Sequence, residues 1–227
     1  MFKIFGLRVW IGAVAYLTVA VSLGLWGLSA ALVQFDINFA VGAALIVSVV
    51  QLVIASLLLT PLWRKVWKKF PILNRLVFPD LSGVWDVEVC SNWPRLKKAI
   101  LDKDIISPEP ELEVNSLRAE VEQTWGHIHM RMWNPAATTP IRDSNTLIVE
   151  PIRGQRGRWP RLIYVFEQQN DQIADTDEQM FFGSVLLDVN PDGSEMSGCM
   201  WSNRSWQQGL NTGAAVRFTR PAEIELG

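Results

Sequence analysis

Tryptophans placed beside amides and arginines are the most distinctive chemical feature of this sequence. Seven of the eleven tryptophans follow residue 80, and several adjoin Asn or Arg, as in Asn92-Trp93, Trp133-Asn134 and Trp201-Ser202-Asn203-Arg204-Ser205-Trp206. Aromatic rings stack on nucleobases, Arg donates paired hydrogen bonds to phosphate oxygens, and Asn or Ser can bond base edges. This combination predicts a site for a small cyclic nucleotide. The alternative is that a β-rich core simply requires large aromatic residues.

The candidate ligand contacts centre on that last block. Arg204 is the first choice for a phosphate contact, supported by Asn203 and Asn211. The candidates for base stacking and for weaker polar contacts are Trp85, Trp125, Trp201, Trp206, Thr139 and Ser144.

Catalytic and metal-binding patterns are not evident in the sequence. It has only two His, His127 and His129, and lacks a Gly-x-Ser-x-Gly elbow, a Walker loop and a Gly-x-Gly-x-x-Gly turn. Two His on one face of a strand do not make a zinc site. Cys90 and Cys199 are expected as free thiols in a reducing cytoplasm. We therefore expect a binding protein rather than an enzyme, with no metal and no cofactor.

The segment from Asp80 onward has the period-two pattern of β-strands. Strands are predicted at 84–89, 119–122, 128–133, 145–152, 162–168, 180–189, 194–202 and 213–219, with Asn, Pro and Gly turn signals between them. Eight antiparallel strands of this length predict a small, lipocalin-like β-barrel that is filled by side chains or holds one small ligand.

Two details of this domain bear on the site. Gly83-Val84-Trp85 is similar to the Gly-x-Trp of lipocalin-like barrels, in which the indole closes one end, although Trp85 could equally be an ordinary core aromatic. A helical period is confined to Pro94–Asp102, and the acidic, Pro-containing segment Leu96–Asn115 is interpreted as an inserted loop over the barrel mouth.

The first third of the chain contains two long uncharged runs. They are Val9–Phe35 and Ile37–Trp63, separated by Asp36, and each exceeds the roughly 20 apolar residues of a membrane-spanning helix. We predict a transmembrane hairpin over 1–63, with spans 9–33 and 39–63, then a basic linker over 64–79 and a cytoplasmic domain over 80–227. A cleaved signal peptide is the alternative for the first run.

The charges predict the topology and limit the partners. Residues 1–79 hold seven Lys or Arg and one acidic residue, a net charge of +6. Residues 80–227 hold fourteen Lys or Arg and twenty-two acidic residues, a net charge of −8. Basic flanks on both spans place both termini in the cytoplasm. A domain at −8 is a poor binder of DNA or RNA polymers, so an anionic ligand must be held by a local basic pocket.

Polar and small residues in the apolar runs suggest helix contacts. Gln51 and Ser22 lie near the middles of the two spans, and Gly24 follows Ala20 at four-residue spacing. An amide in hydrocarbon needs partners, and small residues permit close approach of helices. Gln51 either pairs with Ser22 or Thr18 within the hairpin or contributes to assembly of several copies in the bilayer.

The segment order and three motifs together resemble a known family. The motifs are Pro79-Asp80-Leu81-Ser82-Gly83-Val84-Trp85, the block Trp201–Trp206, and Gly209-Leu210-Asn211-Thr212-Gly213, before a final strand ending at Arg220. With the preceding hydrophobic pair and basic linker, the chain resembles the two-transmembrane, β-strand-rich effectors of bacterial cyclic-oligonucleotide antiphage signalling systems (CBASS). No catalytic motif is implied.

The resemblance implies a STING-like role on a different fold. The barrel would sense a cyclic dinucleotide made by a partner CD-NTase, self-association into oligomers would follow, and the transmembrane segments would damage the inner membrane, giving abortive infection. Two alternatives from other classes are a membrane-tethered, lipocalin-like carrier for an apolar molecule, with an interior free of Arg, and an adaptor with a filled interior.

Overall fold

The computed structural model describes residues 12, 14–24, 27, 47–56, 60–101, 112–136, 141–154, 158–171, 178–209 and 211–221. The chain forms two compact units. One comprises Met1–Phe70 with Thr124–Gly126, and the other comprises Pro71–Gln123 with His127–Gly227.

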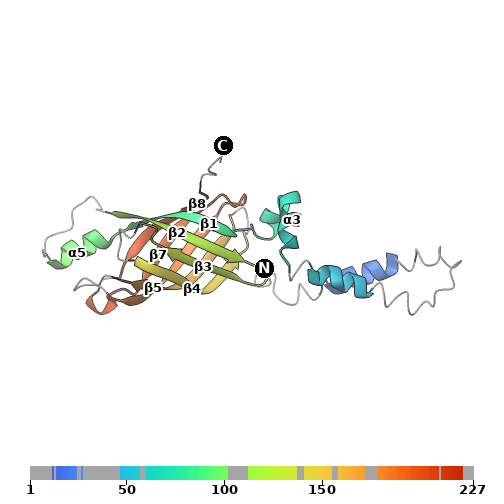
Figure 1. Cartoon of the computed structure of the whole chain (residues 1–227), viewed down its shortest axis with the longest axis horizontal. Coiled ribbons are helices and arrows are strands. Elements are labelled where there is room, and N and C mark those ends of the chain that lie inside the picture. The colour runs from blue at the N-terminus through green and yellow to red at the C-terminus, as the bar shows by residue number, and fades with distance from the viewer. Residues whose placement is uncertain are drawn as a thin grey trace. The chain divides into compact units, whose positions relative to one another are not determined.

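The second unit is a closed antiparallel barrel whose eight strands follow one another in chain order (Figure 1). The strands are β1 Gly83–Ser91, β2 Glu113–Gln123, β3 Ile128–Trp133, β4 Ile141–Ile152, β5 Arg161–Asn170, β6 Met180–Val189, β7 Glu195–Ser202 and β8 Gly213–Thr219. Closure comes from β1, which pairs with β8 as well as with β2. The predicted eight-stranded antiparallel barrel is confirmed.

The interior of the barrel divides into an apolar half and a polar half. At the end where β1, β3, β5 and β7 begin, the buried residues are apolar except for Gln123: Trp85, Val121, Ile128, Leu162, Leu187, Met196 and Phe218. We call this the sealed end, and the opposite end of the strands the polar end. Of the eight buried polar residues described, seven belong to the polar end: Ser91, Ser144, Gln168, Asn170, Ser202, Ser205 and Thr212.

Short helices connect and precede the strands. α5, Trp93–Leu101, follows β1, and the 3₁₀ helix η1, Trp206–Gln208, follows β7. The helical period predicted at Pro94–Asp102 is therefore confirmed through Leu101. The segment Leu96–Asn115, interpreted as an inserted loop, instead begins in α5 and ends in β2; its residues 102–111 lie outside the described residues.

Before the barrel, most of the described residues are helical. Residues 14–24 and 47–56 are helical, and α3, Leu62–Lys69, and α4, Ile72–Leu76, follow. Within the described stretches, none of the helices has both the length and the hydropathy of a membrane span. Much of the predicted spans 9–33 and 39–63 lies outside these stretches, so the transmembrane hairpin stays a prediction.

The residues predicted to assist membrane assembly lie in these described helical stretches. Ser22 and Gly24 belong to residues 14–24, and Gln51 belongs to residues 47–56 with an exposed side chain. Thr18 Oγ1 donates to Val14 O of its own helix at 2.8 Å, which satisfies the hydroxyl without a partner from the other helix. Whether Gln51 contributes to assembly stays a prediction.

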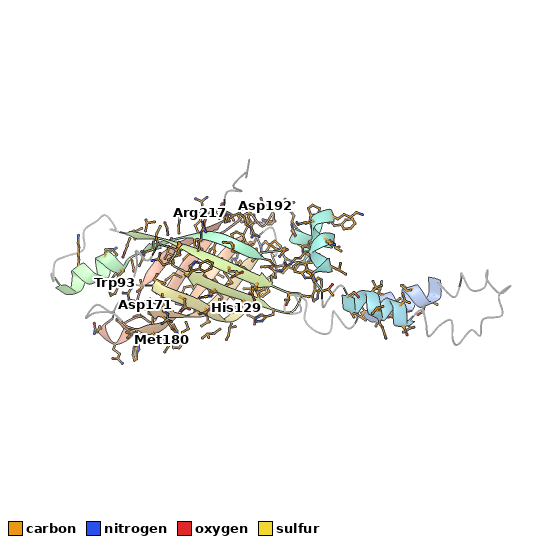
Figure 2. All side chains as sticks on the ribbon, viewed as in Figure 1. Trp93, His129, Asp171, Met180, Asp192 and Arg217 are labelled. Carbon is orange, nitrogen blue, oxygen red and sulfur yellow. The ribbon has the colours of Figure 1, made fainter. Side chains whose placement is uncertain are left out.

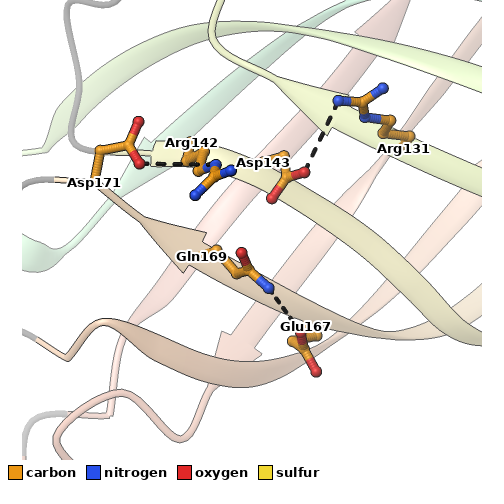
Figure 3. Close-up of polar contacts among 6 residues, drawn as sticks. All are labelled: Arg131, Arg142, Asp143, Glu167, Gln169 and Asp171. Atoms are coloured by element: carbon orange, nitrogen blue, oxygen red, sulfur yellow. Dashed lines mark hydrogen bonds and ion pairs between the residues drawn. The ribbon is translucent and has the colours of Figure 1, made fainter.

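The outer wall of the barrel carries polar pairs, some between neighbouring strands and one within β5. Arg131 lies 3.9 Å from Asp143, Arg142 lies 3.8 Å from Asp171, and Gln169 Nε2 donates to Glu167 Oε1 at 3.2 Å (Figure 3). Exposed pairs of this kind contribute at most about 1 kcal/mol each. These pairs therefore add little to the stability of the barrel.

Candidate ligand-binding site

Arg204 is held between two aromatic rings at the polar end. It follows β7, and its guanidinium carbon lies 3.7 Å from the ring centroid of Trp93 and 5.8 Å from that of Phe181. Trp93 begins α5, and Figure 2 shows it at the same end of the barrel as Met180, with Asp192 at the other end. Stacking occupies the flat face of a guanidinium, whereas its N–H donors lie in the plane of the group. This geometry orients a cation for recognition of an anion.

Hydrogen bonds from Ser202 fix the backbone on both sides of this arginine. Ser202 Oγ accepts from Arg204 N at 3.4 Å, and Ser202 O accepts from Asn211 Nδ2 at 3.3 Å. Ser202 N donates to Thr212 O at 2.9 Å, which extends the β7–β8 ladder by one residue pair. The loop that carries Arg204 is thus tied to the strand before it and to the residue before β8.

Asn203 ties the same loop to β6. Its Oδ1 accepts from Phe182 N at 2.8 Å, and its own backbone N donates to Phe182 O at 2.9 Å. Phe182 is next to Phe181, so this pair of bonds sets the distance between the loop and one of the two rings beside Arg204. The predicted phosphate-supporting residues Asn203 and Asn211 therefore both position the Arg204 loop.

Backbone strain marks the residue after Arg204. Ser205 is buried and has φ 47° and ψ 38°, the left-handed conformation that side chains other than Gly, Asn and Asp rarely adopt. Ser205 is the only non-glycine residue with positive φ in the described part of the chain. Strained residues of this kind cluster at ligand sites because the surrounding contacts hold them there.

Asn92 holds α5 against the start of β8. Its Oδ1 accepts from Gly213 N at 2.9 Å, and its backbone N donates to Gly213 O at 3.0 Å. Ser91 Oγ accepts from Trp93 N at 3.1 Å. Trp93 is fixed by these bonds between β1 and α5, close to Arg204.

The interior next to this loop is polar and uncharged. Gln168 Nε2 donates to Asn170 Oδ1 at 3.1 Å, and Asn170 Nδ2 donates to Glu178 O at 3.0 Å. Ser144, one of the predicted polar contacts, pairs with Gln168 across β4 and β5 and is buried. Amides and hydroxyls in such a position can hydrogen-bond an uncharged polar group of a ligand.

The other sequence-predicted residues are not all near Arg204. Trp85 is fully buried at the sealed end, and Trp125 lies in the first unit, 5.4 Å from Trp67 and 6.2 Å from Trp63 between ring centroids. Trp201 and Trp206 belong to the polar end, in β7 and η1, and both are exposed. Thr139 lies outside the described residues. The base-stacking roles of all four tryptophans stay predictions.

A second stack of arginine on tryptophan closes the sealed end. The Arg220 guanidinium carbon lies 3.9 Å from the ring centroid of Trp85, whose Nε1 donates to Leu81 O at 2.8 Å. Arg220 donates to three carbonyl oxygens: Ser82 O at 2.8 Å, Asp80 O at 3.3 Å and Gly193 O at 3.4 Å. Burial lowers the pKa of Arg220, and the charge of Asp80 partly opposes this effect. Trp85 thus takes the end-closing position expected from the Gly-x-Trp tripeptide.

Sequence reasoning missed two of the residues that touch Arg204. Trp93 stands out in the doublet Asn92-Trp93, but the sequence did not predict where it lies, because the segment Leu96–Asn115 that follows was interpreted as a loop. Phe181 carries no sequence signal beyond the alternation of β6, since it has the burial expected of any core aromatic. Only the closed barrel brings β6, β7 and the start of α5 together.

The fold and its ends define a closed β-barrel with one sealed end and one polar end that carries a stacked arginine. Among curated proteins, the chain is similar to CD-NTase-associated protein 15 of Escherichia albertii, with 23% identity over 160 residues, which are 69% of this chain and 71% of that protein. No protein-family model matches the chain. The similarity supports the coarser part of the sequence prediction, a CBASS-associated protein.

Proposed function

We propose that this protein is the membrane effector of a CBASS antiphage system and that the polar end of its barrel binds a cyclic dinucleotide. The observation that carries the proposal is Arg204, stacked on Trp93 beside an uncharged polar interior. A cyclic dinucleotide combines phosphates with polar bases, which match a cation at the rim and amides and hydroxyls further in. The resemblance of the chain implies this ligand class, and its similarity to a CD-NTase-associated protein supports a role in a CD-NTase system.

The charge distribution makes a local cation such as Arg204 important for binding an anionic ligand. Residues 80–227 carry fourteen basic and twenty-two acidic residues, so their overall field repels a dianionic ligand. A charge-assisted hydrogen bond to phosphate is worth roughly 1.5–3 kcal/mol. We expect Arg204 to supply part of this attraction locally.

Binding would act through the N-terminal helices. A ligand shifts an equilibrium only if it binds one state more tightly, so the oligomeric form must have the higher affinity for the cyclic dinucleotide. We infer that oligomerisation brings the predicted membrane spans together, with Gln51, Ser22 and Gly24 at their contacts. The outcome would be damage to the bacterial inner membrane and abortive infection, with both chain termini in the cytoplasm.

The main alternative is a carrier for an apolar molecule. Such a carrier needs an aliphatic interior, whereas seven buried polar residues belong to one end of this barrel and bulky apolar side chains fill the other. Transferring an apolar ligand into the polar half would leave amides and hydroxyls without partners. The polar interior therefore favours the cyclic dinucleotide.

The test is a binding measurement on the full chain in detergent. Cyclic di-AMP, cyclic di-GMP and cyclic UMP–AMP are titrated by calorimetry, with a long-chain fatty acid as the apolar comparison. We expect at least one cyclic dinucleotide to bind and Arg204→Ala to weaken it about 10- to 150-fold. The matched control is Arg217→Ala, because Arg217 is exposed and pairs with Glu195 at 2.9 Å on the outer wall.

Two outcomes contradict the binding proposal. One is binding of the fatty acid with no response to any cyclic dinucleotide, which favours the carrier. The other is full affinity in Arg204→Ala.

The assembly step has its own measurement. Size-exclusion chromatography of the detergent-solubilised chain should show a larger oligomer when the cyclic dinucleotide is present. An oligomer that does not change on ligand binding would rule out ligand-driven assembly and leave the binding site intact.

A further inference from the structure

Thr212 lies where the loop that carries Arg204 re-enters the barrel. Ser202 N donates to Thr212 O at 2.9 Å, which continues the β7–β8 pairing beyond Trp201 and Gly213. Strand side chains alternate between faces, so Thr212 shares the inward face with Val216 and with Ser202 opposite it. Its side chain is 4% exposed.

The Thr212 hydroxyl is buried without a hydrogen-bond partner. Its Oγ1 has none among the described residues. Most buried polar side-chain atoms in folded proteins are paired, because an unpaired one loses its bonds to water and gains nothing in return. A valine of the same shape would avoid this cost, so we expect the hydroxyl to lower the stability of the unliganded protein.

Ser202 links the backbone of Thr212 to Arg204, the proposed phosphate contact. Its backbone N bonds Thr212 O, and its Oγ accepts from Arg204 N at 3.4 Å. The strained Ser205 lies in the same connection. An orphaned hydroxyl, a strained residue and a stacked arginine therefore occur within one short segment at the polar end.

We propose that Thr212 Oγ1 hydrogen-bonds a nucleobase edge of the ligand, so that binding satisfies a hydroxyl left unpaired in the free protein. This inference rests on the proposed function. A base is favoured over a phosphate as the partner because the buried polar residues described at this end are all uncharged. Moving a phosphate inside would strip its hydration without a compensating charge, whereas Arg204 can hold it at the rim.

The experiment compares two variants with opposite expected signs. The full chain in detergent is titrated with the tightest-binding member of the cyclic dinucleotide panel named above. Thr212→Val keeps the shape and removes the hydroxyl, and we expect its affinity to fall roughly fivefold to tenfold, the range of one net hydrogen bond. Its melting temperature without ligand should equal or exceed that of the wild type. Thr212→Ser keeps the hydroxyl, and we expect affinity within about twofold of the wild type.

The outcomes separate this inference from the function on which it rests. If the wild type binds a cyclic dinucleotide and Thr212→Val binds it equally well, the Thr212 contact is wrong and the function stands. If Thr212→Val melts clearly below the wild type, the hydroxyl has a structural partner and the inference is also wrong. If the wild type binds no cyclic dinucleotide, the proposed function itself fails.

Discussion

An arginine lies over a tryptophan at each end of the barrel, at nearly the same distance: 3.9 Å for Arg220 on Trp85 and 3.7 Å for Arg204 on Trp93. The surroundings of the two stacks differ. Arg220 donates to three backbone carbonyls, and Trp85 below it is fully buried. Arg204 lies between two rings on a loop beside a polar interior.

The comparison shows that the residue pair alone does not define a site. A guanidinium whose donors are used by backbone carbonyls acts as a structural cross-link, here joining the segment before β1 to the β6–β7 turn and the end of β8. Gly83 allows this close approach: it has φ +113°, and a Cβ there would lie 3.1 Å from Arg220 Nη1. The contacts of Arg220 therefore stabilise the sealed end, whereas the polar end is the end that we propose binds the ligand.

The largest effect is expected from removing the indole of the sealed end. Trp85→Ala should lower the free energy of unfolding by about 3–5 kcal/mol, because it leaves a large cavity in an apolar layer. Urea denaturation of the full chain in detergent measures it, and Trp201→Ala, at an exposed position, should change stability by less than about 1 kcal/mol. Equal effects of the two changes would mean that Trp85 does not seal the barrel.

Exchanging each arginine for methionine compares the two stacks directly. Arg220→Met should cost about 2–3 kcal/mol of stability, since half-buried carbonyls lose a charged donor. Arg204→Met should cost less than about 1 kcal/mol in the same assay but should weaken cyclic dinucleotide binding. If the two variants lost stability equally, the proposed difference in role between the sealed end and the polar end would be wrong.

A smaller effect is expected from the tryptophan of the polar end. Trp93→Leu should weaken cyclic dinucleotide binding roughly tenfold, because Arg204 loses the ring that orients its guanidinium. Calorimetric titration gives the affinity, and Trp206→Leu is the matched control at an exposed tryptophan of the same connection. A larger loss of affinity in Trp206→Leu than in Trp93→Leu would indicate that Trp206 stacks on a base, as predicted from the sequence.

The smallest effect concerns the interior between the two ends, where burial raises the pKa of Tyr164. The folded state keeps this phenol neutral, whereas an unfolded tyrosine ionises near pH 10. Its contribution to stability is fully present below that pH and is lost as the pH rises towards the higher folded pKa. The wild type should therefore lose about 1 kcal/mol more than Tyr164→Phe between pH 10 and 11. The measurement is the urea midpoint of each protein as a function of pH. The same pH dependence in both proteins would show instead that water reaches this phenol.

The barrel was largely predictable because each strand carries its own pattern. Alternation in Val84–Val89 or Ile128–Trp133 needs no knowledge of neighbouring strands, and six of the predicted strands agree with β1, β3 and β5–β8 to within two residues at each end. β4 begins at Ile141, four residues before its predicted start. β2 was predicted only at 119–122, although it begins at Glu113. Its first residues, 113–115, fall in the acidic, Pro-containing segment that was interpreted as a loop.

The candidate site was less predictable because its members come from distant parts of the chain. Arg204 was identified from its own motif, but Trp93 reaches it only through closure of β8 on β1, and Phe181 only through pairing of β6 with β7. Asn203 and Asn211 were predicted beside it as ligand contacts; the structure shows their side chains bonded to the backbone. A side chain's partner depends on geometry that residue type does not encode.

The sequence by itself determined the period of the strands, the turns between them, the contrast between a basic N-terminal third and an acidic remainder, and an arginine with aromatic neighbours. These are local properties, and local spacing suffices to read them. Only the tertiary structure decided which Arg–Trp pair seals the barrel and which faces a polar interior. That depends on strand register, because register sets which inward side chains share a layer and which backbone carbonyls lie within reach of a guanidinium.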